Sequence, residues 1–145
     1  MTRRAAAGAA NVDYRDTAAL QGVQQDAVLR NSPGMLPMGR PVAADNVVID
    51  YLWVSKTWEL NHMTTFPGCP AGNKTHCIND PNAANCIRLV RARVCASINS
   101  AGNCTPLPYQ MIFPYFNLSG VTLPPAETIV PVGNLGTPLG TMPCM

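Results

Sequence analysis

The chain has 145 residues, a formal net charge of +2 and only 12% charged residues, while 47% of its residues are hydrophobic. This hydrophobic content argues against an intrinsically disordered protein, and the weak charge argues against nucleic-acid binding, which needs a concentrated basic surface. We therefore expect a single domain, residues 1–145, with a helical N-terminal part at 1–32 and a sheet with a cysteine-rich head at 45–145.

Two short helices are predicted in the N-terminal part. The alanine-rich run at 3–10 favours the end of a helix, which stops near Asn11. Asp16 is placed to cap a second helix at 17–30, because an aspartate before a helix accepts a hydrogen bond from its first turn. We expect this second helix to end at Ser32-Pro33-Gly34 and to cover one face of a sheet. Its apolar residues share one side at helical spacing: Ala19, Leu20, Val23 and Ala27.

Four strands are predicted after residue 45. The segment 47–54 has β-branched and aromatic residues on both sides, which predicts a strand in the centre of a sheet. The segment 87–97 alternates apolar residues with arginines, as in a sheet with one more polar face. Segments 109–116 and 128–132 each contain a proline and are expected at sheet edges.

The order of these segments predicts the fold class. Helices followed by antiparallel strands indicate an α+β fold. We expect the N-terminal helices to pack on a small antiparallel sheet, and the C-terminal half to be rich in proline and stapled by disulfides.

Six cysteines lie after residue 68, and none lies before it. An even number without a Cys-x-x-Cys pair favours disulfides over a zinc site. Cys95 and Cys104 flank a predicted turn at 99–104, so we predict a disulfide between them. The other four cysteines allow three connectivities, and the sequence does not choose among them; one option joins Cys144 to a loop at 66–86. The expected disulfide cysteines are Cys69, Cys77, Cys86, Cys95, Cys104 and Cys144.

The cysteines also predict a compartment. Disulfides persist where the environment is oxidising, so we expect a periplasmic or extracellular protein. Residues 1–10 contain two arginines and lack the long apolar core of a signal peptide or a membrane helix. We therefore expect an N-terminal segment to be missing from this sequence. The alternative is a cytosolic chain with six free thiols.

The sequence predicts no catalytic residue, no metal site and no cofactor. Its two histidines, His62 and His76, lie in loop-like segments, no Gly-x-Ser-x-Gly motif occurs, and the eight acidic residues are scattered. An enzyme would need one of these histidines in a cleft beside a carboxylate. A metal set of Cys69, His76, Cys77 and Cys86 is disfavoured, because adjacent ligands fit one tetrahedral ion poorly.

Aromatic and basic side chains provide candidate binding residues. Tyr51, Trp53 and Trp58 are a candidate platform for a carbohydrate or a peptide, and Tyr51 and Trp53 share a strand face. The alternative for such rings is a place in the core or in an interface. The arginines near the second strand either meet an anionic partner or are solvated or paired charges at a sheet edge. They are Arg88, Arg91 and Arg93.

One segment resembles a known family. Residues 4–21 read Arg-Ala-Ala-Ala-Gly-Ala-Ala-Asn-Val-Asp-Tyr-Arg-Asp-Thr-Ala-Ala-Leu-Gln. They resemble the stretch after the membrane helix in TadE/TadG-like pseudopilins of tight-adherence pili, where an alanine-rich run precedes a turn, a Thr-Ala pair and an amphipathic helix. Pro33-Gly34, Val47-Val48-Ile49 and the region 87–109 also look like that family. The chain lacks the family's membrane helix and the glutamate often found in the alanine-rich run.

The resemblance implies a structural protein, namely the extracytoplasmic part of a minor pilin that is membrane-anchored in its full-length form. Its partners would be other pilin or pilus-assembly subunits in a homo- or hetero-oligomer, with no nucleic acid and with membrane contact only through the missing helix. The alanine-rich helix would pack against other subunits, because small side chains allow close approach. The alternative function is a secreted carbohydrate- or peptide-binding module that uses Tyr51, Trp53 and Trp58.

Overall fold

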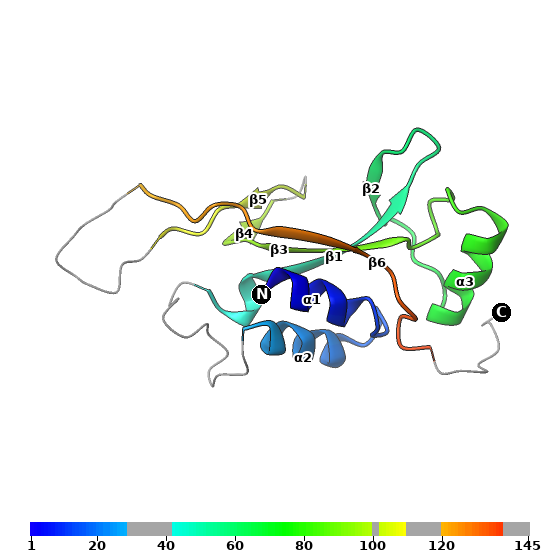
Figure 1. Cartoon of the computed structure of the whole chain (residues 1–145), viewed down its shortest axis with the longest axis horizontal. Helices are drawn as coiled ribbons and strands as arrows, with labels where there is room; N and C mark the ends of the chain where they lie inside the picture. The colour runs from blue at the N-terminus through cyan, green and yellow to red at the C-terminus, as the bar shows by residue number, and fades with distance from the viewer. Residues whose placement is uncertain (29–41, 100–101, 110–119, 138–145) are drawn as a thin grey trace.

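The computed structural model describes residues 1–28, 42–99, 102–109 and 120–137. Within these ranges it contains three α-helices, one 3₁₀ helix and six strands (Figure 1). In chain order they are α1 (Thr2–Ala9), α2 (Thr17–Ala27), η1 (Ala44–Asn46), β1 (Val47–Val54), β2 (Leu60–His62), α3 (Pro70–Asn79), β3 (Leu89–Val94), β4 (Ser97–Ile98), β5 (Cys104–Thr105) and β6 (Glu127–Pro131). The predicted α+β fold is confirmed.

A four-stranded antiparallel sheet forms the centre of the molecule, in the order β2-β1-β3-β6, while β4 and β5 pair separately as a hairpin. β1 lies between β2 and β3, as its apolar residues on both faces predicted. β6 lies at an edge of the sheet, as Pro131 predicted, because proline has no backbone N–H to give to a further strand.

Both N-terminal helices lie on one side of the sheet (Figure 1). α1 packs against β1, β3 and β6, and its side chains Ala5, Ala6 and Ala9 are fully buried. α2 packs against α1 at Gly8, where an added Cβ would lie only 2.9 Å from Val23 Cγ1. The expectation that the second helix covers the sheet is therefore corrected. α1 makes most of the contact with the strands, because its alanines permit a close approach.

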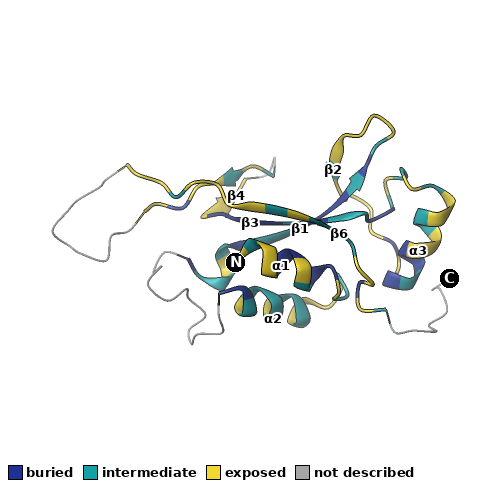
Figure 2. Ribbon diagram, viewed as in Figure 1, coloured by how far each residue is buried: buried dark blue, intermediate teal, exposed yellow. Residues whose placement is uncertain are grey.

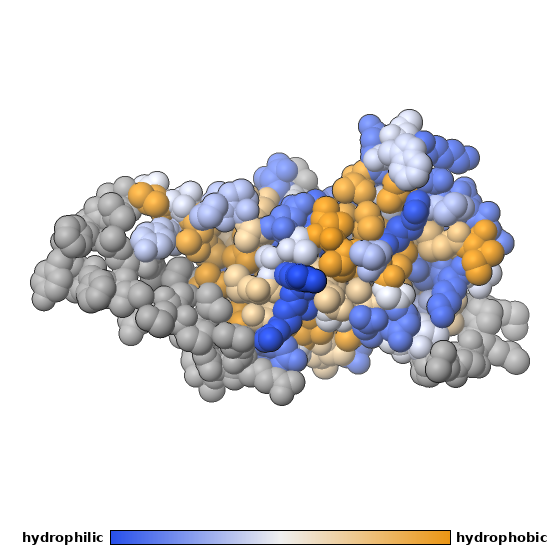
Figure 3. All heavy atoms as spheres, viewed as in Figure 1, coloured by the Kyte–Doolittle hydropathy of each residue, from blue (hydrophilic) through white to orange (hydrophobic). Residues whose placement is uncertain are grey.

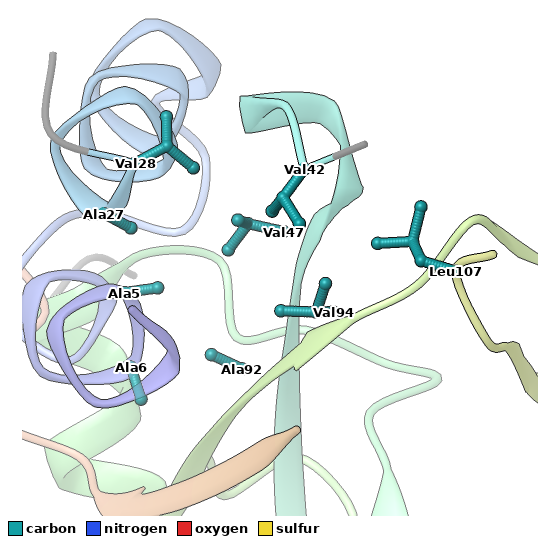
Figure 4. Packing of buried hydrophobic residues seen from close by; sticks show 9 residues of the cluster. All are labelled: Ala5, Ala6, Ala27, Val28, Val42, Val47, Ala92, Val94 and Leu107. Atoms are coloured by element: carbon teal, nitrogen blue, oxygen red, sulfur yellow. The ribbon is translucent and has the colours of Figure 1, made fainter. Parts of the chain in front are cut away.

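Two clusters of buried side chains lie around these helices and the sheet, and Figure 2 shows the buried residues where α1 faces the strands. The first cluster (Figure 4) is made largely of alanine and valine, which keeps the layers close. Its members are Ala5, Ala6, Ala27, Val28, Val42, Val47, Ala92, Val94 and Leu107. The second comprises Ala9, Ala10, Tyr51, Met63, Ile87, Val90 and Leu135.

The start of α2 follows the prediction from sequence. The Asp16 carboxylate accepts a hydrogen bond from the Ala19 backbone N–H at 2.9 Å, which satisfies one of the free donors of the first turn. α2 ends at Ala27, and the expected stop at Ser32-Pro33-Gly34 lies outside the described residues. Among the helices of the described ranges, none has the length and hydrophobicity needed to cross a membrane.

The segment 66–86, predicted as a loop, contains the helix α3. Cys69 is the N-cap, its Sγ accepts from the Gly72 N–H at 3.4 Å, and Pro70 occupies the first helical position. Asn73 is 4% exposed and holds the helix in place, since its side chain both donates to the Ile87 carbonyl at 3.1 Å and accepts from the Ile87 N–H at 2.8 Å. These long-range contacts outweigh the low helix propensity of the local sequence.

The remaining predicted strands have mixed outcomes. β3 and β6 match the segments 87–97 and 128–132, with slightly different ends. The predicted turn at 99–104 connects the arms of the β4–β5 hairpin, and Gly102 adopts a left-handed φ of 77° there. Of the strand predicted at 109–116, only Tyr109 lies within the described residues, and it is in none of the strands.

Candidate functional site on the open face of the sheet

Charged side chains gather on the sheet face that the N-terminal helices leave uncovered. Side chains alternate along β1, so Tyr51 points to the helix side and Asp50 to the opposite, open face. Asp50 lies opposite Arg91 in the register of β1 and β3, and Arg93 lies one step further along the same face. We call Asp50, His62, Arg91 and Arg93 the charged cluster.

One carboxylate oxygen of Asp50 binds both arginines. Asp50 Oδ2 lies 3.2 Å from Arg91 Nε, 2.9 Å from Arg93 Nε and 2.7 Å from Arg93 Nη2. Arg93 also donates from Nη1 to the Gly102 carbonyl at 3.0 Å, which ties the turn of the β4–β5 hairpin to the sheet. Arg93 is 8% exposed, so its charge depends on these partners rather than on water.

His62 completes the cluster from β2. Its Nε2 lies 2.5 Å from Arg91 Nη2, and its Nδ1 lies 3.9 Å from Asp50 Oδ1. Because arginine can only donate, Nε2 of a neutral His62 is the acceptor and the proton is on Nδ1, towards Asp50. This histidine therefore does lie beside a carboxylate, but the nitrogen that a general base would use is occupied by Arg91. In the part of the chain that the structure describes, no hydroxyl or thiol group hydrogen-bonds to it.

The two arginines of the cluster share one carboxylate, that of Asp50. Glu127 of β6 lies directly opposite Arg93 in the register of β3 and β6, and Asp50 pairs with both arginines. Of the three predicted arginines, Arg91 and Arg93 are thus paired and lie on the interior strand β3 rather than at the sheet edge that the sequence suggested, whereas Arg88 precedes β3. Such an arrangement suits the joining of three strands and a hairpin more than the capture of an anion.

The three aromatic residues singled out by sequence do not form one exposed platform. Tyr51 is 7% exposed and lies in the second core cluster, where burial raises the pKa of its phenol. Trp53 is partly buried against the same cluster. Trp58 is 79% exposed in the β1–β2 connection. The core or interface alternative therefore describes Tyr51 and Trp53, and the platform is reduced to Trp58.

A different set of rings meets in the structure. Tyr14 and Phe66 both contact Tyr51, with ring centroids 6.0 and 6.1 Å from it, and they lie 5.4 Å from each other. The Tyr14 hydroxyl donates to the Pro67 carbonyl at 2.5 Å. Sequence reasoning missed Tyr14 and Phe66, because a contact between residues so far apart in the chain leaves no local pattern.

Disulfides anchor both ends of β3. The predicted Cys95–Cys104 bond is confirmed, with a Cα separation of 5.3 Å, and a second bond joins Cys77 to Cys86 at 4.9 Å. Cys86 and Cys95 precede and follow β3 and are 0% and 1% exposed. The two disulfides thus close loops of equal sequence separation on either side of β3. One loop contains the end of α3, and the other contains the β4–β5 hairpin.

The structure also bears on the two remaining cysteines, Cys69 and Cys144, and on the hypothetical metal set. Cys69 is also disulfide-bonded, while Cys144 lies outside the described residues. The Cys77–Cys86 bond removes two ligands of the hypothetical metal set. Within the described ranges, no group of three or more His, Cys, Asp or Glu side chains is placed to hold a metal ion. The disulfides indicate an oxidising, extracytoplasmic location.

Comparison with protein-family models, with curated proteins and with solved structures gave no match for this chain.

Proposed function

We propose that this chain is an assembly component of a bacterial cell-surface pilus, as the extracytoplasmic domain of a TadE/TadG-like minor pilin. The observation that carries the proposal is the combination of two features. One is the alanine-rich pair of helices α1 and α2, and the other is a sheet whose interior strand β3 has a disulfide near each end. Disulfides placed in this way stabilise a small domain in an oxidising compartment.

The segment that carries the family resemblance supports the proposal by its local structure. Residues 4–21 comprise most of α1, a turn and the beginning of α2, which is the order that the resemblance implies. One implied detail changes. The alanines that were expected to contact other subunits are buried against this chain's own sheet, so contacts between subunits have to use other surfaces. On α1 the exposed residues are Arg3, Arg4 and Ala7.

The charged cluster also favours an assembly role over an enzymatic one. Its two arginines share the Asp50 carboxylate, and His62 contacts Arg91 instead of a nucleophile. What the cluster does is to connect β1, β2, β3 and the β4–β5 hairpin on the open face. A surface whose charges are paired with one another and little exposed suits recognition by shape.

The proposal is tested by locating the protein in its source bacterium. An antibody raised against the oxidised domain should detect the chain in the cell envelope and in sheared pili, and a strain that makes no pili should lose the second signal. Reading the coding DNA upstream of Met1 should show an in-frame apolar run of about 20 residues. A cytosolic chain whose cysteines react with an alkylating reagent before reduction would overturn the proposal.

One observation favours the carbohydrate- or peptide-binding module as a second candidate. Trp58 is 79% exposed and has a φ of +64°, which is unfavourable for a residue with a side chain. An exposed aromatic ring on a strained turn is a feature of binding loops. A glycan or peptide library should then quench tryptophan fluorescence in the wild type and in Trp53→Phe, but not in Trp58→Phe. Equal quenching in the wild type and Trp58→Phe would contradict this role of Trp58.

A further inference from the structure

Among the residues that the structure describes, no strand pairs with the outer edge of β6. In an antiparallel ladder, alternate residues bond to the neighbouring strand. The Val94 N–H donates to the Ala126 carbonyl at 3.1 Å, and the Val132 N–H donates to the Arg88 carbonyl at 2.9 Å. Counting in steps of two along β6, Thr128 and Val130 bond to β3. The peptide groups of Glu127, Ile129 and Pro131 therefore point away from the sheet.

The usual protections of a sheet edge lie only at the two ends of β6, and its three middle residues have none. Edge strands are commonly blocked by lysine, proline, bulges or a covering segment. β6 has a glutamate at its first residue and a proline at its last, with Thr128, Ile129 and Val130 between them. α1 contacts β6 on the covered face, where Thr2 and Thr128 hydroxyls lie 2.8 Å apart. In Figure 1, β6 passes in front of β1 and β3, and Figure 3 shows hydrophobic side chains in the middle of this front surface.

We propose that β6 pairs antiparallel with β6 of a second copy of this chain, so that two sheets join into one across a two-fold axis at Ile129. In that register, each Ile129 both donates to and accepts from the other Ile129. Each Glu127 N–H donates to the Pro131 carbonyl of the other copy. The missing N–H of proline therefore leaves only the terminal Glu127 carbonyls without a strand partner.

The side chains fit the same register. Ile129 is 36% exposed on the open face and meets its symmetry mate across the axis, which makes an apolar cross-strand pair. Glu127, the one charged residue of β6, lies opposite Pro131, and the two glutamates are separated by the full length of the pair. Because the axis is perpendicular to the sheet, both helical layers stay on one side. A second copy therefore pairs the apolar Ile129 with itself and keeps the like charges of the two Glu127 side chains apart.

The proposal stands on strand geometry and does not depend on the assignment to a pilus. The oxidised chain should show reversible dimerisation in sedimentation equilibrium as its concentration rises towards about 1 mM, the range expected for a weak interface. Ile129→Pro should leave the β3–β6 ladder intact, because the Ile129 N–H points outward and Pro131 already occupies an equivalent position in the strand. It removes that outward N–H together with the apolar Ile129 side chain. We expect this variant to dimerise about tenfold to 100-fold more weakly, since two hydrogen bonds are lost. Ile129→Val keeps the N–H and the branched side chain and should dimerise like the wild type.

Amide hydrogen exchange provides a second measurement that needs no variant. The Glu127 and Ile129 amides should exchange quickly in dilute protein and become protected as the concentration rises. The Val130 amide, which bonds to β3, should be protected at every concentration. A wild type that remains monomeric up to about 1 mM would overturn the proposal but not the assembly role. Two other results would also overturn the proposed pairing of β6. One is an Ile129→Pro variant that dimerises with unchanged affinity, and the other is protection of the Ile129 amide that does not vary with concentration.

Discussion

The two faces of the central sheet are stabilised in different ways. The covered face consists of apolar side chains, mostly alanine and valine with Tyr51 among them, packed against α1 and α2. The open face contains Asp50 between two arginines, with the hairpin turn attached to Arg93. Burial of apolar area is non-directional, whereas a charge pair of low exposure depends on the position of each atom. The covered face should therefore tolerate small shifts, while the open face fixes the register of the strands.

The largest effect is expected on the covered face. Ile87→Ala removes a fully buried side chain from the second core cluster, and we expect a loss of about 4 kcal/mol in the free energy of unfolding. Urea denaturation of the oxidised protein measures it. Ile78→Ala is the matched control, because Ile78 is 81% exposed on α3 and should change stability by less than about 0.5 kcal/mol. Equal losses in the two variants would mean that this cluster is not the core.

The next effect concerns the open face. Asp50→Asn keeps the shape of the side chain but leaves Arg91 and Arg93 without a carboxylate, and these arginine side chains are only 15% and 9% exposed. We expect a loss of about 3 kcal/mol, because a poorly hydrated charge loses its partner. Chemical denaturation in urea at neutral pH measures this loss.

The control for this prediction is an ion pair in water. Asp13→Asn breaks a contact of 2.8 Å with Arg15, whose side chain is 52% exposed, and should cost less than about 1 kcal/mol. If Asp50→Asn is no worse than Asp13→Asn, the charged cluster does not stabilise the open face, and the contrast between the faces fails.

The covered face could be read from the sequence, and the open face could not. The run 47–54 predicted β1 and its central place because strand propensity and burial point the same way there. Asp50 and the arginines are 41 and 43 residues apart in the chain, so their pairing depends on a strand register that no local pattern states. His62 reached the cluster through β2, a strand of three residues with too little sequence to be recognised.

The cysteine regions show the same limit. The Cys95–Cys104 bond was predictable because a turn with Gly102 lies between the two residues. The Cys77–Cys86 bond was one of several options, since its geometry depends on α3. That helix in turn depends on Asn73 and its contacts with the Ile87 backbone. A helix whose stability comes from a distant strand is not visible in its own propensities.

The smallest of these effects is expected from loss of the Cys95–Cys104 disulfide, which closes the loop that contains the β4–β5 hairpin. Replacing Cys95 and Cys104 together by alanine opens a loop of nine residues and should lower stability by about 2.5 kcal/mol under oxidising conditions. With a reductant present, the variant and the wild type should have the same melting temperature, because neither then contains the bond. An unchanged melting temperature in the oxidised protein would argue against a structural role for this disulfide.

The Cys77–Cys86 disulfide provides a matched comparison for the local effect of losing the Cys95–Cys104 disulfide. Cys77 and Cys86 have the same sequence separation, so their replacement by alanine should cost a similar amount of stability. The two variants should differ in where amide exchange increases. Loss of Cys95–Cys104 should expose the hairpin at Gly102, whose carbonyl accepts from Arg93, whereas loss of Cys77–Cys86 should loosen α3 and leave the hairpin protected. If both variants loosen the hairpin equally, β3 transmits strain between its two ends, and the open face is one cooperative unit rather than two anchored modules.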